Sequence, residues 1–241
     1  MKNIVPSLAL PFLVLPVLVA CESVESTDVL TSGIWAGYTA RATGNGSTLT
    51  EASLKVGGEL SNTFVNLEED DTLTVTSGGE TKTLVEKNIG DIYWYDETFA
   101  TEAADTEFTF AFTRTVDDGA PASTVSLPAP FDITAPAAAF IVKRGVDALT
   151  VTWAPSATDD DMTIALNGDC IEAVSEAPSD DPGTFTFTAD RIVTKEDKET
   201  ESCEGTITVT RRRVGTLDAA FEEGGRVVAE QVRSVSIRLD P

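Results

Sequence analysis

Short segments in which apolar and polar residues alternate recur at intervals of roughly ten residues along this chain. In the clearest, 108–115, Phe108, Phe110 and Phe112 share one face, and in 71–76 threonines alternate with leucine and valine. Several of these segments end at glycine-containing turns, and none after residue 20 has a sustained helical period. This pattern places one face of each strand in a core and the other in water, which is typical of β-sandwiches.

The strand pattern divides at a proline-rich stretch, 128–136, which we interpret as a stiff connector. We therefore expect an all-β fold with two consecutive sandwich domains, at 31–127 and 137–241. The expected strands are 34–42, 47–56, 63–67, 71–76, 83–85, 92–95, 108–115 and 123–127 in the first domain, and 140–142, 149–153, 162–166, 185–193, 205–214 and 226–239 in the second.

The second half resembles immunoglobulin-like and fibronectin-type-III-like sandwiches in strand count, in length and in its Leu-Thr-Val-Thr-Trp strand ending at Trp153. The resemblance is architectural, carries no site motif, and does not by itself imply a function.

An uncharged apolar run from Ile4 to Ala20 precedes Cys21. Its end, Leu18-Val19-Ala20-Cys21, resembles the lipobox of bacterial lipoproteins. The resemblance implies that residues 1–20 are a signal peptide that is removed, and that Cys21 carries the lipid. A transmembrane anchor is the rival interpretation, but the run falls short of the ~20 residues that a spanning helix needs and contains three prolines.

Residues 21–30 are short, polar and acidic, so we expect them to be a tether between the lipid and the first domain. In proteobacterial lipoproteins a residue other than aspartate after the cysteine directs transfer to the outer membrane. The resemblance and Glu22 therefore imply export and anchoring in the cell envelope, at the outer membrane.

Charge and composition exclude several classes of function. The chain has 40 acidic against 17 basic residues, which disfavours nucleic acid and anionic lipid as partners. It has no histidine, so histidine-dependent nucleophile systems and histidine-ligated metal sites are excluded. A two-carboxylate glycosidase and an oxygen-ligand calcium site need no histidine, so the composition does not exclude them.

The cysteine count becomes even once Cys21 is assigned to lipid. Cys170 and Cys203 remain, and in an oxidising exported setting we expect them to form a disulfide. Such a bridge stabilises by roughly 3–4 kcal/mol in the chain-entropy model. In sandwiches of the resembled kind, these cysteines would lie at the adjoining ends of the third and sixth strands.

The final hairpin has an irregular apolar pattern. Ile207 and Val209 share a face with Arg211, so we expect either a bulge near Arg211 or an uncovered face there. The cluster Arg211-Arg212-Arg213 pairs across the hairpin with Glu230 in one interpretation and contacts an anionic partner in another.

Three other groups are candidate binding residues. The acidic loops Asp159-Asp160-Asp161 and Glu68-Glu69-Asp70-Asp71 could bind calcium, although neither has the spaced pattern of a calcium loop, and solvated charge is the alternative. The segment 91–97 is the densest mixture of aromatic and carboxylate residues. Alternation predicts Ile92 and Trp94 in the core and Tyr93 and Tyr95 on the outer face, where they could bind a sugar or simply be amphipathic surface.

We therefore expect a lipid-anchored envelope protein that serves as a non-catalytic structural or protein-interaction module. A polysaccharide-binding or calcium-binding module is the alternative, and a carboxylate-only hydrolase is a third. No cofactor, catalytic residue or metal ligand is assigned, and the expected partners are the membrane through Cys21, other envelope proteins, or polysaccharide.

Overall fold

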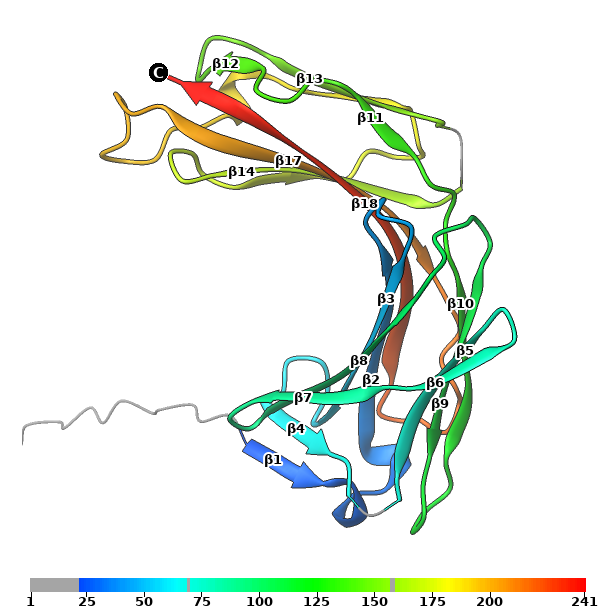
Figure 1. Cartoon of the computed structure of the whole chain (residues 1–241). Helices are drawn as coiled ribbons and strands as arrows, with labels where there is room; N and C mark the ends of the chain where they lie inside the picture. Colours follow the sequence, from blue (N-terminus) through cyan, green and yellow to red (C-terminus); the bar gives the residue numbers. More distant parts are fainter. Residues whose placement is uncertain (1–21, 69, 157–158) are drawn as a thin grey trace, which may run out of the picture.

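The computed structural model describes residues 22–68, 70–156 and 159–241, which form a crescent of two β-sandwiches (Figure 1). The eleven-stranded sheet A lines the concave side of both sandwiches, and two smaller sheets cover its convex side, sheet B in the first sandwich and sheet C in the second. Residues 1–21, which include Cys21 and the segment that resembles a lipobox, lie outside the described residues.

Sheet A contains β1 (Glu22–Glu25), β2 (Ile34–Ala42), β3 (Thr48–Val56), β4 (Thr63–Asn66), β7 (Val85–Ile89), β8 (Ile92–Phe99), β12 (Ile141–Lys143), β14 (Asp161–Gly168), β15 (Val174–Glu176), β17 (Cys203–Val214) and β18 (Gly225–Asp240). Sheet B contains β5 (Thr72–Ser77), β6 (Glu80–Thr83), β9 (Glu107–Thr113) and β10 (Ala120–Ser126). Sheet C contains β11 (Asp132–Ala135), β13 (Leu149–Ala154) and β16 (Thr184–Phe187). Short 3₁₀ turns occur at Ser26–Asp28, Thr31–Gly33 and Ala189–Arg191.

The first sandwich has an aromatic core. The predicted face of β9 supplies Phe108, Phe110 and Phe112, all at most 1% exposed. Tyr38 of β2 stacks on Phe110 with ring centroids 4.8 Å apart. Large rings contribute much of the apolar area that stabilises a core, so sheet B is held on sheet A mainly through these contacts.

The second sandwich places β11, β13 and β16 opposite β12, β18, β17, β14 and β15. This is the strand arrangement of an immunoglobulin-like domain, with the first strand divided between the two sheets. The predicted fold class, all-β with two immunoglobulin-like sandwiches, is confirmed.

One hairpin, β17–β18, belongs to both sandwiches (Figure 1). Its register is constant from Cys203 opposite Leu239 to Val214 opposite Val228, so the predicted bulge near Arg211 is wrong. On β18 one face places Val227 and Ala229 in the first core. Beyond Gln231 and Arg233, the same face supplies Ile237 and Leu239 to the second core and Val235 beside it.

The hairpin changes the domain bounds that the sequence suggested. Phe221, Val227 and Ala229 fall within the predicted second domain, 137–241, yet they pack in the core of the first sandwich. The first half of β18 also pairs in parallel with β2. The first sandwich is therefore made from residues 22–127 together with a returning segment that follows Arg213, rather than from 31–127 alone.

Polar residues of the hairpin fill the junction between the two cores. Arg211 and Gln231 are both 0% exposed. Arg211 donates to the backbone oxygens of Ala129 and Pro155, at 2.6 and 2.7 Å, and pairs with buried Asp181. Gln231 donates to the backbone oxygen of Pro128 at 3.3 Å. The face at Arg211 is therefore covered, because the predicted connector 128–136 supplies two of the carbonyl groups that these side chains bind, those of Pro128 and Ala129.

The predicted tether 21–30 is folded from Glu22 onward. β1 pairs in parallel with β4, and Val24 and Val29 pack against the first core. Arg114, which follows β9, donates to the backbone oxygens of Ser26 and Val29 and pairs with Asp71 at 3.2 Å. The prediction failed because the contacts that hold this segment come from residues distant in sequence, from β4 and from Arg114, which lies more than 80 positions away.

Candidate functional site

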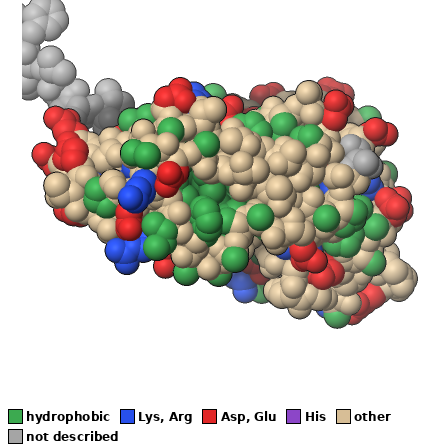
Figure 2. All heavy atoms as spheres, turned by 90° about the horizontal axis from the view of Figure 1, so that it is seen from above, with side chains coloured by type: hydrophobic (Ala, Val, Ile, Leu, Met, Phe, Trp, Pro, Cys, Tyr) green, Lys and Arg blue, Asp and Glu red, His purple; other side chains and the backbone are tan. Residues whose placement is uncertain are grey.

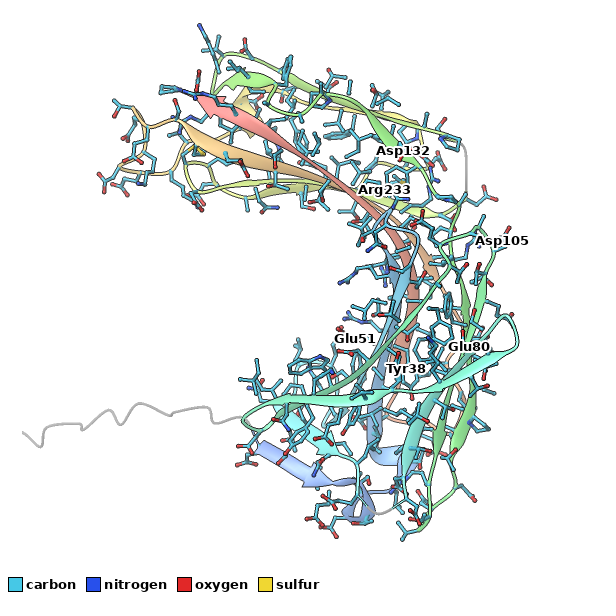
Figure 3. The ribbon with its side chains drawn as sticks, in the orientation of Figure 1. Tyr38, Glu51, Glu80, Asp105, Asp132 and Arg233 are labelled. Carbon is cyan, nitrogen blue, oxygen red and sulfur yellow. A yellow bond between two sulfur atoms is a disulfide. The ribbon has the colours of Figure 1, made fainter. Side chains whose placement is uncertain are left out.

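The solvent face of sheet A in the first sandwich carries a group of aromatic and charged side chains outside both cores. We call this group the concave patch; it consists of Trp35, Glu51, Lys55, Phe64, Trp94, Asp96 and Arg226. Figure 3 shows Glu51 on the concave side of the crescent, whereas Tyr38 lies between the two sheets of the sandwich.

One row of the patch runs across three strands. Phe64, Lys55 and Trp35 are register partners on β4, β3 and β2. The ammonium group of Lys55 lies 5.2 Å from the centre of the Phe64 ring and 6.0 Å from that of Trp35. Cation–π attraction at these separations holds the rings beside the cation.

Trp35 lies flat against the sheet. A Cβ atom at position 37 would be only 2.8 Å from the indole ring of Trp35, so the ring fits there because residue 37 is glycine. The guanidinium group of Arg226 lies 5.8 Å from the ring centre and pairs with Glu59 at 2.8 Å. Trp35 is only 8% exposed and forms the floor of the patch, whereas Phe64 and Trp94 are partly exposed.

The second row brings two carboxylates together. Glu51 of β3 and Asp96 of β8 are direct register partners, and both are partly buried. Like charges opposite each other on a sheet are destabilising, and Lys87, 4.0 Å from Asp96, offsets this only in part. Trp94 lies next to this pair on the same face of β8. The arrangement offers oxygen acceptors beside an aromatic face.

The structure overturns the predicted faces of the segment 91–97. Tyr95 is 1% exposed and lies in the first core, where its hydroxyl group donates to the Val65 carbonyl at 3.1 Å and accepts from the Leu67 amide at 3.0 Å. Burial raises the pKa of Tyr95 well above its usual value. Tyr93 shares the face of Tyr95 and packs beside that core. Trp94, predicted to be buried, lies on the concave side instead.

Sequence reasoning missed the concave patch, although a signal was present. Ile34, Ala36 and Tyr38 share one face of β2 and are buried, so alternation along the predicted strand 34–42 already placed Trp35 on the opposite face. The cross-strand partners of Trp35 depend on strand pairing, which the sequence alone does not reveal.

In each of the two acidic loops one carboxylate is buried, and it binds an arginine side chain, a backbone amide or both. Asp71 is 6% exposed and accepts hydrogen bonds from the amide and hydroxyl of Thr115, at 2.7 and 3.0 Å. Burial raises the pKa of Asp71, but the bonds from Thr115 and Ser26 together with Arg114 outweigh it and leave the pKa below its usual value. Asp160 binds Arg213 through both carboxylate oxygens.

The structure does not support calcium binding at these two loops. Glu68 accepts from Asn66, Asp159 and Asp161 are exposed, and Glu69 lies outside the described residues. Within residues 22–68, 70–156 and 159–241, no three Asp, Glu or Cys side chains are placed to hold a metal ion.

The arginine cluster 211–213 divides between two environments. Arg211 is buried in the junction, and Arg213 pairs with Asp105 at 2.8 Å as well as with Asp160. The hydrogen bonds that Arg213 donates to the Asp160 carboxylate raise the pKa of Arg213. Arg212 is the register partner of Glu230, but the carboxylate of Glu230 binds Arg41 at 2.8 Å. Arg211 and Arg213 therefore hold the junction of the two sandwiches and are not free to bind an anion, whereas Arg212 is partly exposed.

The predicted disulfide between Cys170 and Cys203 is present, with Cα atoms 6.0 Å apart. It joins the adjoining ends of β14 and β17, which pair antiparallel up to Gly168 opposite Gly205. Cys21 lies outside the described residues, so its lipidation stays a prediction.

A second surface feature lies at the far end of the second sandwich. A pocket of about 450 Å³ is lined by Ala138, Ala139, Ser202, Cys203, Glu204, Ser236, Ile237 and Arg238. Phe140 and Ile141 follow it in the chain and are 50% and 52% exposed. Elsewhere the surface is strongly acidic, and Figure 2 shows acidic side chains spread around one face of the molecule rather than gathered in one patch.

Comparisons with known proteins leave the family open. No protein-family model matches the chain, and no curated protein matches it. Similar solved structures include a chimeric titin Z1Z2, at 11% identity and a TM-score of 0.25, covering 88% of this chain and all of that one. Fibronectin(III)-like modules of Clostridium thermocellum CbhA give 14% identity and a TM-score of 0.24, covering 86% and 90%.

A glucan-utilization protein of Bacteroides ovatus, SGBP-B, solved with a mixed-linkage heptasaccharide, gives 13% identity and a TM-score of 0.21, covering 85% of this chain and 60% of that one.

Proposed function

We propose that this protein is a non-catalytic module of the cell envelope, anchored by lipid at Cys21, that binds a neutral carbohydrate chain across the concave patch. The observation that carries the proposal is the placement of Trp94 beside the carboxylates Glu51 and Asp96, with Phe64 on the same solvent face of sheet A.

The chemistry of the patch suits a sugar ring. The CH groups of a pyranose pack against a flat aromatic face, while its hydroxyl groups donate to carboxylate oxygens. Lys55 and Lys87 add donors for ring and hydroxyl oxygens. The formal net charge of −23 disfavours an acidic polysaccharide, so a neutral one is the better fit.

Lipid anchoring rests on the lipobox resemblance at Leu18-Val19-Ala20-Cys21, and Glu22 favours the outer membrane. In the described part of the chain, no helix is long and apolar enough to cross a membrane. Two or more acyl chains on the cysteine would suffice for stable attachment.

Interaction with another envelope protein is a second candidate. It is favoured by the pocket of about 450 Å³ beside exposed Phe140 and Ile141, an apolar surface on the second sandwich remote from the concave patch. Calcium binding is not proposed, because Asp71 and Asp160 are occupied by Thr115, Arg114 and Arg213.

Affinity electrophoresis in gels containing soluble glucan, mannan or galactan tests the carbohydrate proposal. The mature domain should be retarded by at least one of these polymers, and Trp94→Ala should weaken the retardation at least tenfold. Phe140→Ala is the matched control, because it removes an exposed ring from the second sandwich. Equal retardation of the wild type and Trp94→Ala in every polymer would refute the concave patch as the binding surface.

Cell fractionation tests the anchor. Cys21→Ser should move the protein from the membrane fraction to the soluble fraction, with the thermal unfolding of its sandwiches unchanged. A Cys21→Ser protein that stays in the membrane fraction would show that attachment does not depend on lipid at this residue.

A further inference from the structure

The free end of the first sandwich combines the start of the folded chain with three exposed aliphatic side chains. Leu60 is 94% exposed, Ile89 73% and Ile92 37%. Leu60 lies in the turn before β4, and the two isoleucines face each other across the turn that joins β7 to β8. We call Leu60, Ile89 and Ile92 the aliphatic tip.

The segments that carry these residues lie against Glu22 and β1. The amide of Glu22 donates to the backbone oxygen of Asn62 at 3.1 Å, two residues after Leu60. β1 also lies against β8. Figure 1 shows the start of β1, the turn between β7 and β8 and the start of β4 at the same end of the lower sandwich.

The chain is folded from Glu22 onward, so no flexible segment separates Cys21 from the first strand. Glu22 is already part of β1, and Ser26 and Val29 are fixed by Arg114. One residue spans at most about 3.6 Å, so an acyl chain attached to Cys21 holds β1 within a few ångströms of the headgroups. A tether of ten flexible residues would leave the orientation free, whereas a folded segment does not.

We infer that the aliphatic tip is a membrane-contacting surface, in which Leu60, Ile89 and Ile92 enter the headgroup region of the bilayer that holds the lipid of Cys21. This inference rests on the proposed lipid anchor. Aliphatic side chains at a membrane interface are removed from water, which favours this orientation over one in which the tip stays exposed. Glu22 and Asp91 are exposed at the same end, so zwitterionic lipid is the fitting surface.

Site-directed spin labelling of the lipidated full-length protein in phosphatidylcholine vesicles tests this inference. Cys170 and Cys203 form a disulfide and Cys21 carries the lipid, so a single introduced cysteine is the free thiol. Labels are placed by Leu60→Cys and Ile89→Cys at the tip. Glu80→Cys is the control, because Glu80 lies on the convex side of the crescent (Figure 3).

Labels at 60 and 89 should be several-fold more accessible to oxygen, which partitions into the bilayer, than to a water-soluble nickel chelate. The label at 80 should show the opposite preference. Tip labels as accessible to nickel as the control, on protein that floats with the vesicles, would overturn the membrane-contacting tip and leave the anchor intact. Protein that does not float would overturn the lipid anchor, and the tip inference with it.

Discussion

The two sandwiches close their ends by different means. In the first, buried Arg114 donates hydrogen bonds to the backbone oxygens of Ser26 and Val29 and pairs with Asp71. In the second, the Cys170–Cys203 disulfide joins β14 to β17, and Arg144 donates to the Cys170 carbonyl at 3.0 Å. The first core is rich in stacked rings, whereas most of the second is aliphatic and surrounds Trp153.

This difference shows how two unlike cores can share one hairpin. β18 contributes aliphatic side chains to both cores and β17 contributes them to the second, while Arg211 and Gln231 separate the two cores with hydrogen bonds. Because the strands continue without a break in register, unfolding of one sandwich removes strands from the other. We expect the molecule to unfold as one cooperative unit in spite of its two cores.

The largest effect should come from cutting the chain at the connector. A chain of residues 22–136 lacks Phe221, Val227 and Ala229 and the strand that pairs with β2, so we expect it to show no cooperative thermal transition by circular dichroism. The chain 22–241 is the reference. A cooperative melt with a near-ultraviolet aromatic signal in 22–136 would show that the first sandwich is independent of the hairpin.

Breaking the junction should have the next largest effect. Arg211→Ala leaves Asp181 buried without its cation, which costs about 3–5 kcal/mol of unfolding free energy. Urea denaturation measures this loss, and Arg211→Met combined with Asp181→Leu should recover much of it. A loss below about 1 kcal/mol would contradict a structural role for the buried pair.

Removing the disulfide should cost somewhat less. Cys170 and Cys203 are 33 positions apart in the sequence, and the disulfide closes the loop between them. Replacing both by alanine opens this loop and should lower the unfolding free energy by roughly 3–4 kcal/mol. Fluorescence of Trp94 reports on the first sandwich and that of Trp153 on the second. In single-tryptophan variants both signals should shift to the same lower urea midpoint; a shift of the Trp153 signal alone would show that the sandwiches unfold separately.

Asp71 should give the smallest effect and one that depends on pH. Its pKa is lowered by folding, so the stabilisation is complete above the ordinary pKa near 4 and is lost as the pH falls through the folded-state pKa. Asp71→Asn should destabilise by about 1.5–3 kcal/mol at pH 7 and by less at acid pH. Urea midpoints of both proteins between pH 7 and pH 2 measure this, and a constant difference across the range would contradict it.

Much of the fold follows from local alternation. The predicted strand 34–42 coincides with β2, and Phe108, Phe110 and Phe112 share a buried face as expected. The disulfide followed from an even cysteine count. These features depend on residues near one another in sequence or on simple chemistry, so they could be predicted from the chain alone.

The failures share a physical cause. On β18, Gln231 and Arg233 interrupt an apolar face that serves two cores, and on β17 Arg211 follows Ile207 and Val209 on one face. Without knowledge of the junction these polar positions resemble a bulge. In β8, both faces carry aromatic residues, so alternation alone does not identify the core face. Tyr95 lies in the core because its hydroxyl group binds the backbone of Val65 and Leu67. In both cases the deciding contacts come from distant parts of the chain.

The shared hairpin also separates the order of synthesis from the order of folding. The first sandwich begins at residue 22, but its core lacks a strand until Ala229 has been delivered, near the end of the chain. The nascent first sandwich therefore exposes its aromatic residues while nearly all of the second is still being made or exported. A chain built in this way needs protection from aggregation until β18 arrives, so the sandwich that is begun first is completed only shortly before the second one.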